Sequence, residues 1–297
     1  MKLEELRDLL DKVRSQWPET WPGTQNYVDQ CLGILGHSAA LESDQGITAI
    51  YRCMTALAEQ IESHGRQLAE RGEEPPYHNR LHTVDTLFSL TALLLGQRHG
   101  WTKKTAAWRR REWIAMLAML GHDFLHDGTV NVSPGQIERR SIECLTPLMI
   151  RCGVSAEDIA VVRVLIENTD PKKVRECHLK MRGRPFRIED TDCLIVLVQE
   201  ADIMASALPW TGHELTLRLA REWAKIMPDR ARALLTPQGR VSFLRDAALF
   251  TSPASNTLGL NQIKREQIAE IECRERGRRI RRRLVSRCKS QRSGKCG

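Results

Sequence analysis

The spacing of apolar residues is the feature that most limits how this chain can fold. Apolar side chains recur at steps of three and four residues in stretch after stretch, as in the run from Tyr77 to Leu95. This spacing places them on one face of an α-helix. No segment alternates apolar and polar residues well enough to predict a β-strand. A chain of 297 residues can also bury a large core. We therefore expect an all-α protein, folded as a compact bundle of many helices.

We expect three parts along this chain. Residues 1–74 are predicted to form an N-terminal helical portion that packs on a catalytic helical body, residues 75–273, and residues 274–297 form a basic tail. The boundary near residue 74 rests on the Gly- and Pro-containing sequence from Arg71 to Pro76, which is typical of a junction. The same sequence also fits a simple loop that leads into the next helix.

The positive charge of the chain is concentrated at its C-terminal end. The net charge is +8, and residues 274–297 contain eleven Lys and Arg side chains against one Glu, so the rest of the chain is slightly acidic. Clustered arginines bind polyanions by releasing their counterions, which makes nucleic acid, an anionic lipid surface or an acidic partner a candidate for binding to residues 274–297. The alternative is a solvated helix end without a partner.

Cysteine usage and the N-terminus indicate the compartment. The nine cysteines are odd in number and show no CxxC spacing, which favours reduced thiols over a disulfide framework. Residues 1–8 predict an amphipathic helix with acidic side chains, unlike a signal peptide. No apolar run approaches the roughly twenty residues that span a bilayer. These features favour a cytoplasmic protein without a transmembrane segment.

Two histidines four residues apart, His78 and His82, mark the first chemically informative segment. Pro75 and Pro76 suit the first turn of a helix, so we expect one helix from Tyr77 to Leu95. Both imidazoles would then project from the same side of that helix. One ring is in position to hold a metal ion while the other faces a substrate.

Two further segments place acidic or imidazole side chains beside apolar helices. His122 and Asp123 end the apolar run from Trp113 to Gly121, His126 follows one turn later, and Gly128 is a plausible end of that helix. An aspartate there loses its hydration unless a cation compensates it.

Asp202 replaces a hydrophobe on the inward stripe of a helix predicted from Leu194 to Ala207. Pairing with a buried arginine is the alternative interpretation of Asp202. Taken together, these imidazoles and carboxylates predict one site for a divalent metal, and therefore hydrolysis.

These segments resemble a known family. The strings from Tyr77 to His82 and from Gly121 to Gly128, followed by Asn131 and Asp202, look like the signature of the class I cyclic nucleotide phosphodiesterases, within the HD-domain phosphohydrolases. Weaker similarities are the Thr-Asp pair at 169–170 and the Ser-Pro pair at 252–253. The resemblance covers approximately residues 77–271. It implies an HD-domain, phosphodiesterase-like helical bundle.

The resemblance also implies a role for each matching residue. His82, His122, Asp123 and Asp202 would hold a first metal, zinc or else iron or manganese. Asp123 would bridge to a second metal, magnesium or manganese, and a hydroxide between the two metals would attack phosphorus. His78 would protonate the leaving alkoxide as general acid. His126 would steer the water or a ligand, and Glu143 would orient His78 or a metal-bound water.

The substrate pocket departs from the family pattern. The family reads its purine with a glutamine and stacks it on a phenylalanine three positions later. Gln267 fits the glutamine, but Glu270 stands where the aromatic belongs and offers no stacking surface. Gln262 is an alternative reader. By the same resemblance, Asn131, Thr169 and Gln267 are expected to contact the substrate.

The sequence thus favours hydrolysis of a 3',5'-cyclic nucleotide, such as cyclic AMP or cyclic GMP, to a nucleoside 5'-monophosphate. An HD-type nucleotidase or phosphomonoesterase would use the same metals. A non-catalytic regulatory module that binds polyanions through its arginine-rich tail is the alternative from a different class. The intact set of expected ligands argues against this last alternative.

Overall fold

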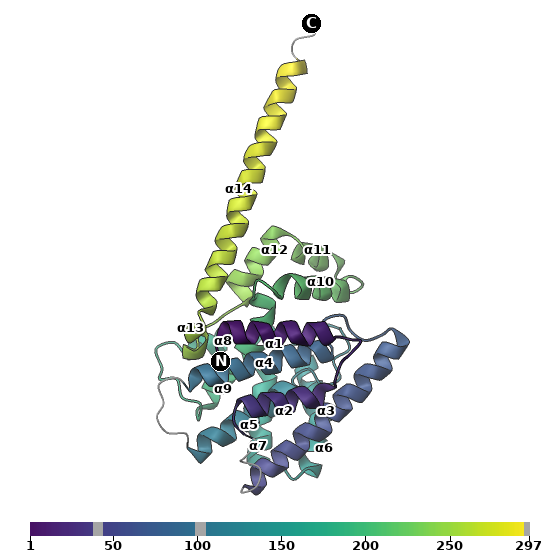
Figure 1. Cartoon of the computed structure of the whole chain (residues 1–297), viewed down its shortest axis with the longest axis vertical. Coiled ribbons are helices and arrows are strands. Elements are labelled where there is room, and N and C mark those ends of the chain that lie inside the picture. Colours follow the sequence, from purple (N-terminus) through teal and green to yellow (C-terminus); the bar gives the residue numbers. More distant parts are fainter. Residues whose placement is uncertain (38–43, 99–104, 294–297) are drawn as a thin grey trace.

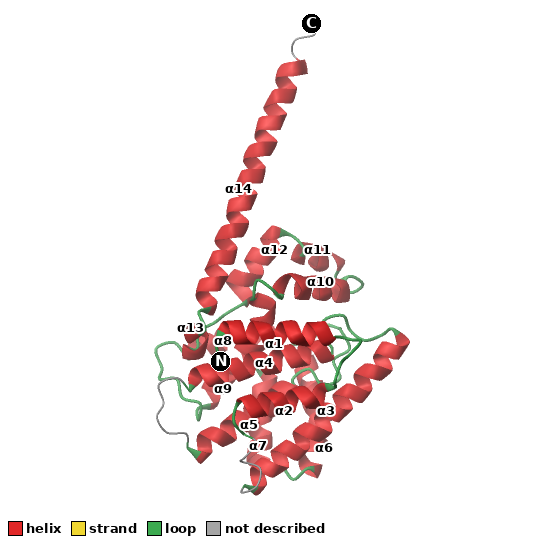
Figure 2. Cartoon of the chain, viewed as in Figure 1, coloured by secondary structure: helices red, strands yellow, loops and turns green. Residues whose placement is uncertain are grey.

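The computed structural model describes residues 1–37, 44–98 and 105–293, with side chains through Arg278. Within these ranges the chain forms fourteen α-helices and one short π-helix, and it contains no strand (Figure 2). The all-α fold that the apolar spacing predicts is therefore confirmed for the described residues, and the helices form a compact bundle.

The helices follow one another through short connections. In chain order they are α1 (Leu3–Gln16), α2 (Thr24–Ile34), α3 (Gln45–Arg71), α4 (Arg80–Gln97), α5 (Ala106–Gly121), α6 (Gln136–Arg151), α7 (Ala156–Glu167), α8 (Pro171–Lys180), α9 (Thr191–Ala207), α10 (Gly212–Trp223), α11 (Pro228–Leu234), α12 (Pro237–Ser242), the π-helix η2 (Phe243–Ala247), α13 (Pro253–Thr257) and α14 (Leu260–Ser293).

Helix α4 is the central element of the bundle, and nearly all of its side chains are buried. It packs against α9, α1, α2, α5 and α13. Leu6 and Leu10 of α1 belong to the same continuous apolar core as Phe88 of α4 and Leu197 of α9. The helices of residues 1–74 therefore share one core with the rest of the body.

The long helix α14 leaves this body. It starts beside α13 and extends far beyond the other helices, so that the C-terminal end of the chain lies away from the bundle (Figure 1). At 1.5 Å per residue its 34 residues span about 50 Å. The helix runs through residues 273 and 274 without a break, so the boundary predicted there does not interrupt the backbone.

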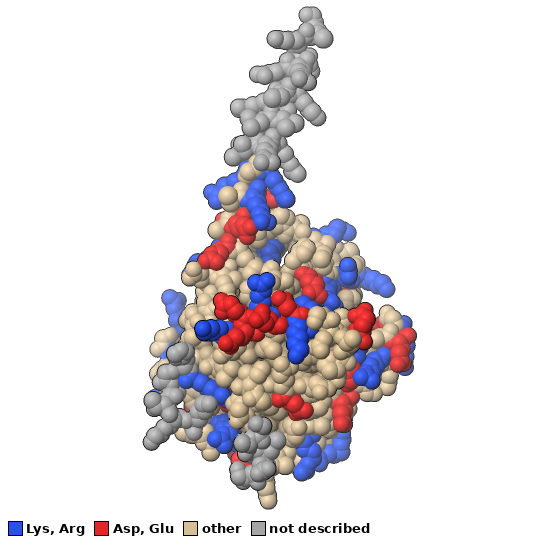
Figure 3. Space-filling model, in the orientation of Figure 1, with Lys and Arg blue, Asp and Glu red and all other residues tan. Residues whose placement is uncertain are grey.

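The body carries a mixed surface. On the face drawn in Figure 3, acidic and basic side chains are interspersed over the bundle. No single described helix is long and apolar enough to cross a bilayer, whereas α9 and α10, which meet at a 98° bend, together have the necessary length and composition.

The start of α4 differs from the prediction. The helix begins at Arg80 instead of Tyr77, because Asn79 is its N-cap: the Asn79 side chain accepts hydrogen bonds from the N–H groups of Leu81 and His82. Its amide also donates to the carbonyl oxygen of Pro75. His78 therefore lies in the loop before the helix, and only His82 projects from α4.

The end of α5 also comes earlier than predicted. The helix stops at Gly121 instead of continuing toward Gly128. Leu125 adopts a left-handed backbone with φ 61°, a conformation that ends helical geometry. His122, Asp123 and His126 are consequently presented by a turn at the helix end, which aims the first two back at α4 and α9.

Candidate metal centre

Four of the predicted residues converge at one place. Nε2 of His82 lies 3.4 Å from Oδ2 of Asp123 and 3.3 Å from Oδ1 of Asp202. Nε2 of His122 lies 3.2 Å and 3.4 Å from the same two oxygen atoms. The four side chains come from α4, the turn after α5 and α9. The structure thus brings together the donors that the sequence assigned to a first metal.

The two imidazoles present their free nitrogens to this centre. Nδ1 of His122 lies 2.7 Å from the carbonyl oxygen of Met119, which can only accept, so in the neutral ring Nδ1 carries the proton and Nε2 offers its lone pair. The Nε2 atoms of both His82 and His122 are buried and form no hydrogen bond. A buried nitrogen without a partner is costly, and a cation at this point would satisfy both.

The separations between these donors fit a common cation. Two donors each about 2.1 Å from an ion lie about 3.0 Å apart at a right angle and about 3.4 Å apart at the tetrahedral angle. The four nitrogen-to-oxygen distances, 3.2 to 3.4 Å, fall in this interval. Two imidazoles with two carboxylates form a donor set that suits zinc, iron or manganese.

The short distances between these imidazoles and carboxylates also change their pKa values when no cation is bound. Burial opposes the charged imidazole of His82, but Asp123 and Asp202 raise its pKa to about 9. They also raise the pKa of His122 well above its usual value. In turn, although burial opposes their ionisation, both carboxyl groups have lowered pKa values because the imidazoles are adjacent. Binding of a divalent ion therefore competes with protonation of the two imidazoles.

A second group of titratable side chains borders the first. Nδ1 of His78 lies 2.5 Å from Oε1 of Glu222 on α10, and the other oxygen of Glu222 accepts hydrogen bonds from the N–H groups of Tyr77 and His78. Burial opposes ionisation of Glu222, yet His78 and these N–H groups hold its pKa below the usual range. An ionised Glu222 therefore fixes His78 in orientation.

His126 completes this second group. Its ring stacks on that of His78, with centroids 3.9 Å apart and planes 19° apart, and its Nδ1 accepts a hydrogen bond from the N–H of Gly128. Burial, followed by the charge on His78, lowers the pKa of His126 to about 4. His78, His126 and Glu222 also have donor atoms close together. However, imidazole lone pairs lie in the ring plane, so near-parallel stacked rings are poorly arranged to share one ion.

Glu143 does not reach the centre. Its side chain is exposed on α6, whereas Glu138 on the same helix is buried beside Asn131. Burial, together with the negative charges of Asp170 and Asp123, raises the pKa of Glu138. The expectation for Glu143 is therefore corrected, and Glu138 is the buried acidic side chain of α6 whose ionisation the charge of Asp123 affects.

A sequence signal for Glu138 did exist. It lies on the buried stripe of α6 that continues through Ser141, Ile142 and Leu145, and Glu143 lies off that stripe. Asn131, predicted to contact substrate, donates to both oxygens of Glu138 and accepts from the N–H of Ile137. The observed role of Asn131 is thus to hold Glu138.

A cavity of about 800 Å³ opens from this centre. Asp202, His78 and Thr169 line it. Aromatic surface comes from Trp223 and Phe243. Neither was singled out from the sequence, because nothing in the chain marks which aromatics on distant helices share a cavity.

Gln267 lies outside this cavity. Its amide donates to the carbonyl oxygen of Ala207 and accepts from Arg240, both at 2.8 Å, so its hydrogen-bonding groups join α14 to α9 and α12. The expected base-reading role of Gln267 is therefore corrected. Glu270, which forms an ion pair with Arg274, is exposed.

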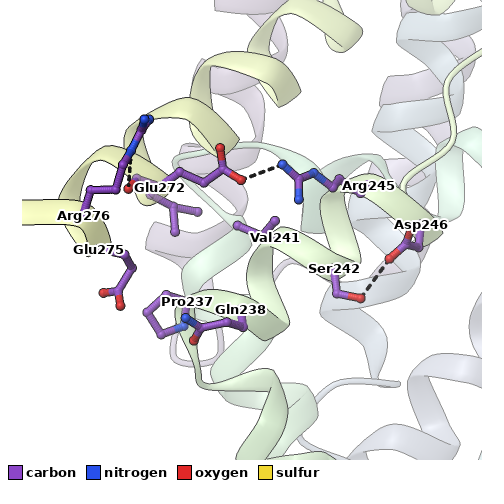
Figure 4. A pocket seen from close by; sticks show the side chains of 10 residues that line it. Pro237, Gln238, Val241, Ser242, Arg245, Asp246, Glu272, Glu275 and Arg276 are labelled. Carbon is purple, nitrogen blue, oxygen red and sulfur yellow. Dashed lines mark hydrogen bonds and ion pairs between the residues drawn. The ribbon is translucent and has the colours of Figure 1, made fainter. Parts of the chain in front are cut away.

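A second hollow, of about 530 Å³, lies between α12, η2 and the lower part of α14 (Figure 4). Arg245 and Glu272 form an ion pair across it. Gln238, Ser242 and Asp246 line both this hollow and the larger cavity, so the two are separated by α12 and η2. None of the four donors of the metal centre lines it.

Comparison with known proteins returned no relative: neither the protein-family models nor the curated protein sequences match this chain.

Proposed function

We propose that this chain is a metal-dependent phosphohydrolase of the HD-domain, phosphodiesterase-like class, which cleaves a cyclic nucleotide phosphodiester to a nucleoside 5'-monophosphate. The observation that carries the proposal is the pair of buried Nε2 atoms of His82 and His122, which lack hydrogen-bond partners and face Asp123 and Asp202. Two imidazoles and two carboxylates that converge this closely form a donor set for a divalent cation.

The chain's own residues account for the remaining steps. Divalent ions held by His82, His122, Asp123 and Asp202 would supply a nucleophile from water and neutralise charge on the phosphoryl oxygens. His78, which lines the cavity, donates a proton to the leaving alkoxide, and Glu222 holds the proton-bearing ring in place. The cavity beside Asp202 receives the organic part of the ester.

Asp123→Asn tests the proposal. Purified protein should contain bound divalent metal and hydrolyse bis(p-nitrophenyl) phosphate and cyclic AMP, and the variant should lose at least a hundredfold of both activities. Asp127→Asn is the matched control, because Asp127 lies in the same turn but is 45% exposed and paired with Arg140. Full activity in Asp123→Asn, or protein that binds no divalent metal, would overturn the proposal. Faster release of phosphate from nucleoside monophosphates than hydrolysis of diesters would favour the phosphomonoesterase alternative.

The basic segment 274–297 supports a separate proposal, contact with a polyanion. Helix α14 carries the start of this segment away from the body, where the bundle does not cover it (Figure 1). Affinity for a nucleic acid or for anionic vesicles should fall steeply with salt and disappear after truncation at Cys273. Unchanged affinity after truncation would exclude this contact.

A further inference from the structure

The last part of helix α14 carries a dense positive charge. Ten of the twenty residues from 274 to 293 are Lys or Arg, and no Asp or Glu follows Glu275 in the sequence. Arg274 and Arg278 pair with glutamates of the same helix. The basic residues from Arg281 onward have no acidic residue within four positions, which is the reach of an ion pair along a helix. The helix itself therefore does not compensate this charge.

The basic residues of α14 leave one narrow strip of the helix without charge. The backbone is helical through Ser293, so each residue is turned by about 100° from the one before it. Six positions then fall within a sector of about 80°, and they form the uncharged stripe: Cys273, Gly277, Ile280, Leu284, Cys288 and Gln291. All ten Lys and Arg residues between 274 and 293 fall outside this sector.

The body does not follow this part of the helix. Helix α14 packs against α13 and α12 and then extends beyond all the other helices (Figure 1). At 1.5 Å per residue, residues 274–293 extend over about 30 Å. A partner with a broad, flat surface can therefore contact the whole length of the uncharged stripe and the basic residues on both sides of it.

The uncharged stripe distinguishes among the possible partners. A second copy of α14 would bring ten more basic residues, and the stripe is shorter than the three to four heptads of apolar positions that are typical of a coiled coil. Nucleic acid would attract the arginines, but its phosphates make no use of Ile280 and Leu284. The surface of an anionic bilayer suits both features, because its headgroups attract arginine and its acyl boundary buries apolar residues.

We propose that residues 273–293 of α14 bind an anionic membrane surface, with the helix axis in the plane of the membrane and the uncharged stripe on the lipid side. Arg281 and Arg287 border the stripe on its two edges, so both would meet the headgroups in this orientation. The inference rests on the proposed contact between residues 274–297 and a polyanion, and it names the partner.

Binding of the full-length protein to vesicles tests the inference. Wild type should bind phosphatidylcholine vesicles that contain phosphatidylserine at least tenfold more tightly than vesicles of phosphatidylcholine alone. The double variant Ile280→Gln, Leu284→Gln should bind the anionic vesicles at least tenfold more weakly, because two large apolar residues are lost while glutamine keeps the helix propensity. Ser286→Gln, outside the stripe, is the matched control and should bind as wild type does. Affinity for a DNA duplex should be the same in all three proteins.

The outcomes separate this inference from the polyanion contact on which it rests. If truncation after Cys273 abolishes binding to anionic vesicles but the double variant binds them like wild type, the polyanion contact stands and the proposed orientation on lipid is wrong. Binding to the DNA duplex without binding to anionic vesicles would overturn the inference in favour of nucleic acid. A dimeric wild type that becomes monomeric in the double variant would assign the stripe to a second copy and also overturn it.

Discussion

Nδ1 of His78 lies 2.5 Å from Oε1 of Glu222, although the two residues are 144 positions apart in the sequence. The contact joins the loop before α4 to α10. The same carboxylate also accepts from two backbone N–H groups of that loop, so it determines both the position of the loop and the direction of the imidazole.

Replacing Glu222 by glutamine should therefore weaken proton donation by His78. We expect kcat for cyclic AMP to fall about tenfold or more in Glu222→Gln and about 10² to 10⁴-fold in His78→Ala. The leaving group of bis(p-nitrophenyl) phosphate needs little protonation, so kcat for this ester should fall much less in both variants. Steady-state rates of both variants on both esters test this, and equal losses on the two esters would exclude the acid role of His78.

Removing one carboxylate from the metal centre should remove metal-dependent stability. Wild-type protein should gain on the order of 2–3 kcal/mol when a divalent ion is present at a hundred times its dissociation constant. In Asp202→Asn this gain should be greatly reduced, together with the metal content. Thermal unfolding with and without metal, plus elemental analysis, measures both quantities. Asp192→Asn, on the same helix but paired with Lys180 and outside the four donors, should keep the wild-type metal response, and an unchanged metal response in Asp202→Asn would contradict the assignment.

Acid should destabilise the fold through Glu62. Burial opposes its ionisation, but hydrogen bonds from Trp21, Arg66 and Arg80 lower its pKa to about 2. A lowered folded-state pKa means that the stabilisation is complete above the unfolded value of about 4.3 and is lost as the pH falls toward 2.

In wild type, the free energy of unfolding measured with urea should fall between pH 7 and pH 2.5. In Glu62→Gln this fall should be smaller by on the order of 2 kcal/mol. Glu59→Gln, an exposed site on the same helix, is the control and should keep the wild-type pH dependence. If Glu62→Gln shows the same pH dependence of stability as wild type, the Glu62 carboxylate does not contribute to it.

The buried ion pair between α1 and α4 should be essential for stability. Arg14 donates to both oxygens of Asp85, at 2.9 and 2.7 Å, and Asp85 is fully buried. Arg14→Met leaves that carboxylate without its cation, which should cost about 3–5 kcal/mol. Chemical denaturation measures the loss. Lys12→Ala, at an exposed position of α1, should change stability by less than about 0.5 kcal/mol, and a similarly small change in Arg14→Met would show that Asp85 finds another partner.

The sequence predicted those parts of the molecule that local patterns determine. Periodic apolar residues identify α4, α5 and α9, and the carboxylate of Asp202 stands out because it lies on the inward face of an otherwise apolar helix. The helix ends were predicted less well. Two prolines favoured an early start for α4, but the cap formed by Asn79 determines the actual start.

Contacts between distant segments carried no local signal. In the sequence, Glu222 looks like an ordinary charged residue of an amphipathic helix, and its proximity to His78 depends on how α10 packs on α9. The same holds for Gln267, whose partners on α9 and α12 are decided by the path of α14. Residues of this kind need the fold itself to reveal their partners.

The cap at Asn79 separates two kinds of imidazole within five residues. His82 belongs to α4, which is buried on nearly every side and is therefore held rigidly. A rigid position suits a donor that must keep a fixed distance from an ion. His78, one residue before the cap, is instead anchored by a carboxylate from a different helix. A single amide side chain therefore divides this short motif into one imidazole fixed by its own helix and one imidazole fixed by a distant helix.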